Sequence, residues 1–215
     1  MRDALEKAMA SGRIKSFGGP WAVWGSTIRR GFVSVNATRA AVADVTDPIQ
    51  IADATAQMRR EIPAIIEVMR EADPAFKGAW LAQTAAASGF RECREIAALH
   101  RVTAEEFASG EDVPDAIALA AHPMDRHIAG SSAQNLTFLD KPGVIPLRAL
   151  VSAKCPNLLA AGGLVAAEPA AFASMRVQAQ CMAMGQAAGT AAAFRPSEDV
   201  RWLDFAAIAR LVVSR

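Results

Sequence analysis

The chain has 215 residues, with 23 Lys and Arg against 22 Asp and Glu and a formal net charge of +1 at pH 7. This balance gives no reason to expect a nucleic-acid partner or an anionic membrane surface as a partner, because both need a strongly basic surface. The three cysteines, Cys93, Cys155 and Cys181, are far apart. No two of them have the spacing of a zinc site, so we expect buried, reduced thiols.

Two features of the sequence concern targeting. The segment Met1–Lys7 carries charges where a signal peptide needs an apolar core. The most apolar tracts, 158–174 and 181–194, contain polar residues and are too short to span a bilayer. We therefore expect a soluble, cytoplasmic protein. Hydrophobic residues nevertheless make up 52% of the chain, slightly more than is usual for a soluble protein, and much of the excess is alanine near the C-terminus.

The first third of the chain predicts helices and one hairpin. The predicted elements are a helix at 2–10, strands at 21–24 and 32–38 joined by Arg29-Arg30-Gly31, and a long helix that begins at Thr46-Asp47-Pro48 and ends at Asp73-Pro74. Pro63 lies inside the pattern of the long helix and predicts a kink or a restart there.

The remainder mixes strands and helices. The predicted strands are 79–86, 94–102, 116–121, 144–150 and 157–161, and the predicted helices are a short one between Thr103 and Gly110, a long one at 174–194 and a final one at 202–213. This order is not a regular alternation of strand, helix and strand. It therefore predicts an α+β fold with a mixed sheet.

The longest of the late helices has no charged residue between Met182 and Ala193. A helix that is apolar or small on every side is usually buried. Gly185 and Gly189 leave one face without side chains, so that another backbone can come close. Each glycine costs the helix about 1 kcal/mol relative to alanine, which calls for a packing or functional reason. Tight helix packing alone is one such reason.

The approach to this helix suggests a ligand site. The strand at 157–161 leads into Gly162-Gly163, and a loop then brings Ser174-Met175-Arg176 to the helix entrance. The unpaired N–H groups and the positive end of the helix dipole would point to one place. Arg176 would add a fixed positive charge. This arrangement predicts binding of an electron-rich ligand edge.

These same segments carry a family resemblance. Asn157–Gly162 reads N-L-L-x-A-G, Ser174–Val177 reads S-x-R-V, and Cys181–Ala192 reads C-M-A-x-G-Q-A-A-G-T-A-A. With them the chain resembles FAD-dependent oxidoreductases that have a glutathione-reductase-type Rossmann domain. Other segments resemble the substrate side of that family: 17–21, 35–39, 89–96, 123–127 and 145–148.

The resemblance implies FAD as the cofactor and flavin-mediated hydride or electron transfer on a small organic substrate. Residues 1–150 would form a substrate-side (cap) domain, and residues 151–215 would form the C-terminal part of the FAD-binding domain. By the same resemblance, Ser174, Met175 and Arg176 would lie along the pyrimidine edge of the flavin. Gly162 and Gly163 would let the backbone pass close to the ribityl chain.

The resemblance also suggests substrate-side residues, which are Arg91, His127 and Arg148. The arginines would bind an anionic or carbonyl oxygen, and His127 would place or move a proton. Each residue has a structural alternative: Arg91 could pair with a neighbouring glutamate, His127 could cap a loop, and Arg148 could be structural. Asp125 and His127 lack a third ligand, so no metal site is predicted.

One motif of such enzymes is missing. The pyrophosphate of FAD needs G-x-G-x-x-G, and no two glycines of this chain are separated by a single residue. We therefore expect an incomplete or split polypeptide that needs a partner chain or a missing domain to supply the Rossmann fold. The alternatives are a non-catalytic remnant and a protein-interaction module that docks through its Ala/Gly-rich helix.

Overall fold

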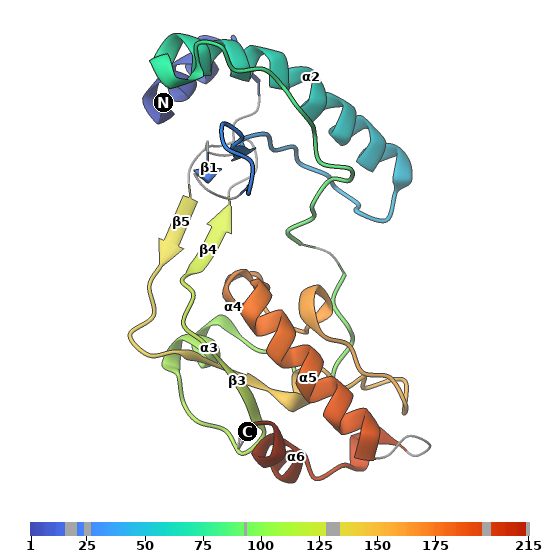
Figure 1. The fold of residues 1–215 in the computed structure, drawn as a ribbon. Coiled ribbons are helices and arrows are strands. Elements are labelled where there is room, and N and C mark those ends of the chain that lie inside the picture. Colours follow the sequence, from blue (N-terminus) through green and yellow to red (C-terminus); the bar gives the residue numbers. More distant parts are fainter. Residues whose placement is uncertain (16–20, 24–26, 93, 128–133, 195–198, 214–215) are drawn as a thin grey trace. The chain divides into compact units, whose positions relative to one another are not determined.

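A computed structural model describes residues 1–15, 21–23, 27–92, 94–127, 134–194 and 199–213 (Figure 1). These residues form an α+β fold of helices and small two-stranded sheets, which confirms the predicted fold class. The Gly-Gly-Pro segment at 18–20 and Cys93 lie outside the described residues.

The chain divides into two compact units. The first contains Met1–Phe90 and His127–Gln134, and the second contains Arg91–Arg126 and Asn135–Arg215. Residue 150 lies within the second unit. The expected division between a substrate-side region and a flavin-side region therefore does not coincide with a division between compact units, and it stays a prediction about function.

Helices make up most of the regular secondary structure of the first unit. Its elements are α1 (Arg2–Ala10), β1 (Trp21–Val23), β2 (Ser34–Asn36), α2 (Pro48–Ala72) and the 3₁₀ helix η1 (Pro74–Phe76). β1 pairs with β2 in an antiparallel register, which confirms the predicted hairpin. α2 begins where the sequence predicts, because the Asp47 carboxylate accepts a hydrogen bond from Ile49 N at 2.9 Å.

Pro63 does not restart the long helix. α2 continues through it for 25 residues, although a proline removes one backbone hydrogen bond from a helix interior. The apolar residues that follow it, Ile65, Val68 and Met69, are buried in one cluster with Leu5 and Ala8 of α1. Burial of that face favours a continuous helix over a break.

The second unit holds the rest of the fold. Its elements are α3 (Ala104–Ser109), β3 (Ala116–Ala120), β4 (Met124–His127), β5 (Gln134–Thr137), β6 (Gly143–Pro146), α4 (Pro169–Met175), α5 (Gln178–Phe194), α6 (Phe205–Val213) and the 3₁₀ helices η2 (Leu147–Ala149), η3 (Gly162–Leu164) and η4 (Val200–Trp202). His127, the last residue of β4, and Gln134, the first residue of β5, are assigned to the first unit. β3 pairs antiparallel with β6, and β4 pairs with β5.

Three predicted strands are wrong as regular strands. Segment 79–86 has no regular secondary structure, and its apolar side chains Trp80 and Leu81 are exposed. Segments 94–102 and 157–161 are extended but pair only through isolated bridges, such as the antiparallel bridge from Ala98 to Ser152 and the parallel bridge from Val102 to Ala167. In place of one mixed sheet, the described residues contain two-stranded sheets and single bridges of both senses.

The single helix predicted at 174–194 is two helices. α4 begins at Pro169, whose fixed φ suits the first turn of a helix, and it ends at Met175. The five residues from Ala171 to Met175 are all buried, whereas α5 buries only one face. The residues of α4 are therefore surrounded by the core, whereas α5 has one side exposed, and the two helices do not form one straight helix. The chain turns at Arg176 and Val177 before α5 begins.

The packing of Phe107 predicts a position that cannot carry a larger side chain. A Cβ added at Gly143 would lie 2.4 Å from Phe107 Cζ, and Phe107 is fully buried. We expect Gly143→Ala to lower the free energy of unfolding by about 1–3 kcal/mol, measured by urea denaturation followed by circular dichroism. Gly78→Ala is the control, because a Cβ at Gly78 meets nothing within 4 Å. Equal stability of the two variants would contradict this packing.

An ion pair in the first unit predicts a pH dependence. Arg13 donates two hydrogen bonds to the Glu71 carboxylate, at 2.6 and 2.7 Å, and these lower the pKa of Glu71 from its ordinary value. Because the pKa is lower in the folded state, the pair stabilises the fold at neutral pH. That stabilisation is lost as the pH falls through the lowered pKa.

We therefore expect Glu71→Gln to lower the thermal unfolding midpoint at pH 7 and to leave it unchanged at about pH 2. Glu111→Gln serves as the control, since Glu111 is exposed and its side chain has no ion pair among the described residues. If the unfolding midpoints of the parent and of Glu71→Gln differed by the same amount at both pH values, the ionisation of Glu71 would not be linked to stability.

Candidate functional site

The predicted arrangement of glycines beside a helix start is present. Gly162 has φ +69°, a left-handed backbone conformation that favours glycine. A Cβ placed there would lie 3.7 Å from Cys181 Sγ, which is an ordinary contact, so the backbone conformation rather than lack of space requires glycine. Cys181 is in the first turn of α5. The turn at Gly162 therefore packs directly against the beginning of α5.

The other glycines of the site face open space. A Cβ at Gly163, Gly185 or Gly189 would meet nothing within 4 Å in the described structure. All three residues are exposed. Leu164, which follows Gly163, has 47% of its surface exposed. The backbone along this surface is accessible to a ligand or to another chain segment.

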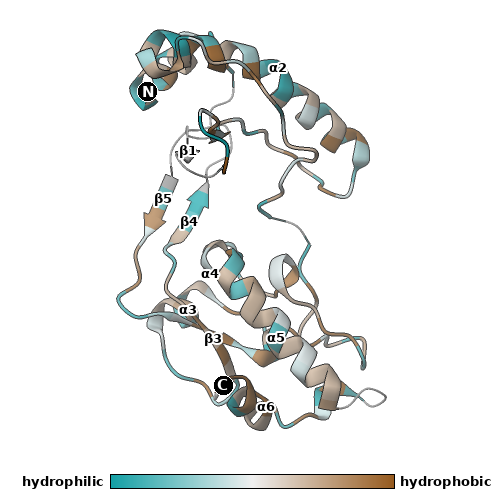
Figure 2. Ribbon diagram, viewed as in Figure 1, coloured by the Kyte–Doolittle hydropathy of each residue, from teal (hydrophilic) through white to brown (hydrophobic). Residues whose placement is uncertain are grey.

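The prediction that α5 is buried on every side is wrong for one face. Its buried residues are Gln180, Met184, Ala187 and Ala191, which share one side of the helix. At 100° per residue, Gly185 and Gly189 lie near the middle of the opposite, exposed side. Most of α5 is white or brown in Figure 2, in accord with its lack of charge. The helix is thus uncharged on a face that no described residue covers.

Arg176 lies in the turn between α4 and α5. Its Nη2 donates to the backbone O of Asp125 at 3.3 Å. Its Nε is buried and has no hydrogen-bond partner among the described residues. Burial lowers the pKa of Arg176 from its ordinary value, and the positive charge of Arg91 lowers it further, whereas Asp125 and Glu92 act in the opposite direction. A buried donor without a partner is costly, so a ligand atom is a natural partner for it.

Ser174 and Met175 differ from Arg176 because their side chains are fully buried. Ser174 Oγ donates to the backbone O of His122 at 2.5 Å. This hydrogen bond ties the end of α4 to His122, just before β4, and the one from Arg176 ties the following turn to Asp125 in β4. The two side chains therefore support the site from within the core, and a ligand could reach only backbone atoms there.

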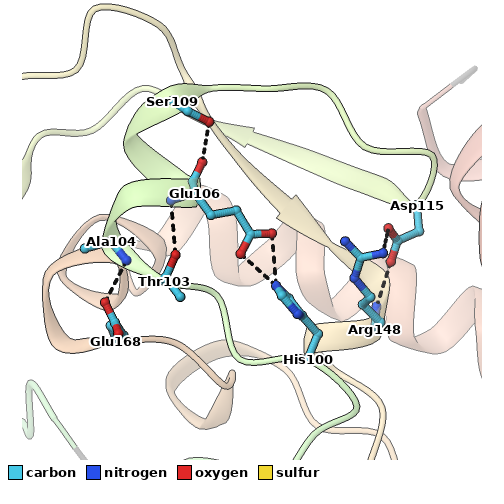
Figure 3. Close-up of polar contacts among 8 residues, drawn as sticks. All are labelled: His100, Thr103, Ala104, Glu106, Ser109, Asp115, Arg148 and Glu168. Atoms are coloured by element: carbon cyan, nitrogen blue, oxygen red, sulfur yellow. Dashed lines mark hydrogen bonds and ion pairs between the residues drawn. The ribbon is translucent and has the colours of Figure 1, made fainter.

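Arg91 and Arg148 differ in whether they have a partner within the described part of the chain. Arg91 is exposed, and no hydrogen bond or ion pair joins it to another described residue; the pairing with a neighbouring glutamate is not found. Arg148 instead forms an ion pair with Asp115, Nη1 to Oδ1 at 3.3 Å (Figure 3). Its backbone N also donates to Asp115 Oδ2 at 3.1 Å. Arg148 has a structural partner, and its substrate role stays a prediction.

His127 is the last residue of β4. Its side chain lies outside the described part of the structure, so its predicted role in proton transfer stays a prediction. Met124, at the other end of the strand, is buried in the core of the second unit.

Two glutamates hold the segment between the glycine turn and α4. Glu168 Oε2 accepts from Ala104 N at the start of α3, at 2.8 Å (Figure 3), and its own N donates to the backbone O of Val102 at 2.8 Å. Glu95 Oε2 accepts from Ala167 N at 3.3 Å. These contacts fix residues 167 and 168 on both sides of the chain. The position from which α4 begins is therefore set by acidic side chains.

Sequence reasoning missed two contributors. Gln180 is 8% exposed, and its Oε1 is buried without a hydrogen-bond partner among the described residues. Its spacing from Met184 and Ala187 places it on the buried face of α5, and this helical spacing was a usable signal. The second contributor is the backbone O of Asp125, which accepts the hydrogen bond from Arg176. No sequence pattern identifies a backbone carbonyl as the acceptor for an arginine distant in the sequence.

The remaining chemistry near the site is limited. Burial raises the pKa of the Cys181 thiol, and Sγ donates to the backbone O of Arg176 at 3.3 Å. The thiol is therefore protonated at neutral pH. Within the described ranges, no three His, Cys, Asp or Glu side chains gather as a possible metal site.

Among the helices that the structure describes, none is both long and apolar enough to cross a membrane.

Comparison with known proteins identifies the family. A family model described as FAD dependent oxidoreductase matches residues 7–212. No curated protein and no solved structure matches the chain. The match spans both compact units and includes the glycine turn, the turn between α4 and α5, and α5 itself. The chain belongs to the FAD dependent oxidoreductase family.

Proposed function

We propose that this chain is the part of an FAD-dependent oxidoreductase that holds the flavin edge and the substrate, and that the enzyme acts on a small organic molecule. Family membership implies FAD as the cofactor. FAD, when bound, supplies a ring that accepts or donates a hydride or electrons. The observation that carries the proposal is the convergence of the Gly162 turn, the start of α5 and the buried Nε of Arg176.

The residues present fit one edge of the cofactor. The pyrimidine edge of a flavin carries carbonyl and ring-nitrogen acceptors, and Arg176 Nε is a buried donor without a partner in the described part of the chain. The open surface at Gly163 would let a ligand lie close to the backbone. The pyrophosphate is different, because the 215 residues contain no G-x-G. The fit is therefore to the ring and not to the dinucleotide.

Each predicted residue has a role in this proposal. Gly162 and Gly163 let the backbone pass close to the ribityl chain. Arg176, with the backbone at Ser174 and Met175, lies along the pyrimidine edge, where its charge and the dipole of α5 favour electron density.

The substrate side of the proposal rests on other groups. Arg91 orients the substrate, and His127 holds or moves a proton. Arg148, paired with Asp115, contributes by positioning η2, because its backbone N and its guanidinium both contact that carboxylate.

The exposed face of α5 favours the proposal that a further segment of protein packs against this helix in the complete enzyme. Gly185 and Gly189 lie on an uncharged face, where a backbone could come within contact distance. We propose that a segment with the dinucleotide-binding fingerprint packs there, from a partner chain or from another part of the polypeptide. The same open face would also serve a protein-interaction module, which is the second candidate. A remnant that folds without flavin is the third.

The first prediction concerns the chain by itself. Since one edge alone contacts the flavin, we expect the purified chain to bind FAD weakly or not at all. A visible absorption spectrum after gel filtration in the presence of FAD measures this. Co-expression with the product of a neighbouring reading frame that contains G-x-G-x-x-G should yield a yellow complex. Stoichiometric flavin on the chain alone would overturn the requirement for a second part, and a colourless complex would favour a remnant or an unrelated module.

The second prediction concerns the glycine face. Gly189→Leu should stabilise the isolated chain by about 1 kcal/mol, since leucine is a better helix former and its Cβ meets nothing. The same change should prevent assembly with the dinucleotide-binding part, because a side chain now fills the contact surface.

Gly78→Leu is the matched control, since Gly78 is also open and lies in the first unit. It should leave assembly unchanged. Normal flavin incorporation by Gly189→Leu would show that the complementing segment does not pack on this face.

A further inference from the structure

The chain that follows α2 and η1 runs back along α2, and side chains of that helix hold it in place (Figure 1). Arg70 Nε donates to the backbone O of Ala79 at 2.8 Å. Arg59 Nη2 donates to the backbone O of Ala85 at 3.3 Å. The contacts follow α2 in the reverse direction, so this segment lies antiparallel to the helix.

The spacing of the contacts indicates that the segment is extended. Arg59 and Arg70 are 11 residues apart in α2, which is about 16 Å along the helix axis. Six residues of the segment cover that distance, at about 2.7 Å each, compared with about 3.3 Å in a strand and about 1.5 Å in a helix. Beyond Ala85, the hydroxyl oxygens of Thr55 and Ser88 are 2.7 Å apart and share a hydrogen bond, which continues the same course.

One edge of the extended segment faces α2, and the other edge is open. Ala79 and Ala85 are an even number of residues apart, and alternate residues of an extended chain direct their N–H and C=O groups to the same edge. The odd-numbered residues therefore face α2. Between 80 and 86, the O of Ala85 is the single backbone group with a hydrogen bond to another described residue. The residues that face away from α2 are Trp80, Ala82, Thr84 and Ala86.

The open edge is accessible to another chain. Residues 80–83 and 85–87 are exposed, and Trp80 has 69% of its surface exposed. A row of unpaired N–H and C=O groups on an extended chain is a template for a further strand, because the spacing of these groups matches that of another extended backbone. The edge is therefore suited to a strand rather than to a helix.

The lack of charge favours a second copy of this segment as that strand. No residue from Gly78 to Phe90 is charged, so two copies can lie antiparallel across a two-fold axis without like charges opposite one another. The arginines of α2 occupy the other edge. Because that edge is covered, the assembly closes at two copies and cannot grow into a fibre.

We propose that two copies of this chain form a dimer through antiparallel pairing of residues 80–86. The two-fold axis passes through Gln83, which brings the even-numbered residues of the two copies opposite one another. The hydrogen-bonded pairs are then Trp80 with Ala86 and Ala82 with Thr84, each formed twice.

The size of the contact sets the strength of the dimer. Stable interfaces bury about 1,200–2,000 Å² in total, and seven residues from each copy bury less than this. The dimer is therefore weak and reversible, with a Kd on the order of 100 µM. It does not involve flavin, so its test is independent of the proposed function.

Sedimentation velocity of the full chain over a range of concentrations measures the dimer. Thr84→Pro should weaken it by at least about tenfold, because proline removes one N–H of the ladder from each copy. Gln83→Pro is the matched control, since the N–H of Gln83 faces α2 and lies outside the ladder. It should change the Kd by less than about twofold. Circular dichroism reports whether both variants keep their helices.

Hydrogen exchange followed by NMR identifies the paired residues. At a concentration of about ten times the Kd, about four fifths of the chains are dimeric, so the paired N–H groups should exchange about fivefold more slowly than in dilute solution. The slowed groups should be those of Trp80, Ala82, Thr84 and Ala86. The N–H groups of Leu81 and Gln83, on the other edge, should keep their rates.

Several results would overturn the strand-paired dimer. They are a monomer at every concentration up to about 1 mM, equal weakening by Thr84→Pro and Gln83→Pro, and slowed exchange that does not alternate along the segment. If exchange slowed only after a dinucleotide-binding part was added, the open edge would belong to that part and not to a second copy.

Discussion

The hydrogen bonds that tie the turn between α4 and α5 to residues 122–125 determine the geometry of the site. Ser174 donates to the His122 carbonyl from a fully buried position, and Arg176, two residues later, donates to the Asp125 carbonyl. They add directional contacts to the core packing that Met124 of β4 shares with Met175 and Met184. The region at the start of α5 and the strand β4 are thus joined by Ser174 and Arg176. From the sequence, these two residues were expected only to contact a ligand.

The same region shows how supporting contacts and ligand contacts are divided. Glu168, Glu95 and Ser174 satisfy backbone groups inside the protein, whereas Arg176 Nε and Gln180 Oε1 are buried without partners in the described part of the chain. Unsatisfied buried groups are few in folded proteins. Two of them occur within five residues around the start of α5, and Arg148 Nε is a further buried atom without a hydrogen bond in the described structure. A ligand or water at the start of α5 would satisfy the first two.

Local elements were largely predictable from sequence, because their signals are local. The Asp47 cap, the Thr103 cap, whose Oγ1 accepts from Glu106 N at 3.1 Å, and the left-handed Gly110 all appear where residue types demand them. The predictions of regular strands at 94–102 and 157–161 were wrong, because strand pairing depends on which distant segment lies opposite, and a local pattern does not contain that information. The exposed side of α5 could not be foreseen either. An uncharged helix predicts burial, but composition does not say whether the covering layer is present.

For the candidate site, residue spacing pointed to Gly162 and Arg176, and missed Gln180, the Asp125 carbonyl and the Asp115 partner of Arg148. Arg148 illustrates the difficulty: an arginine two residues after a proline looks like a ligand group until a buried aspartate 33 residues away is found beside it. Such pairings are decided by tertiary packing, and no sequence separation signals them.

The contacts that build the site join residues very distant along the chain. Ala167 and Glu95 are 72 residues apart, Ala104 and Glu168 are 64 apart, and Ser174 and His122 are 52 apart. Closing loops of this length costs chain entropy before any contact repays it. The helices of the first unit can form early, from neighbouring residues, whereas the anchors around α4 must form late. Newly synthesised chains would therefore pass through a stage in which α1 and α2 are folded while the apolar residues 158–174 are still open to intermolecular contact.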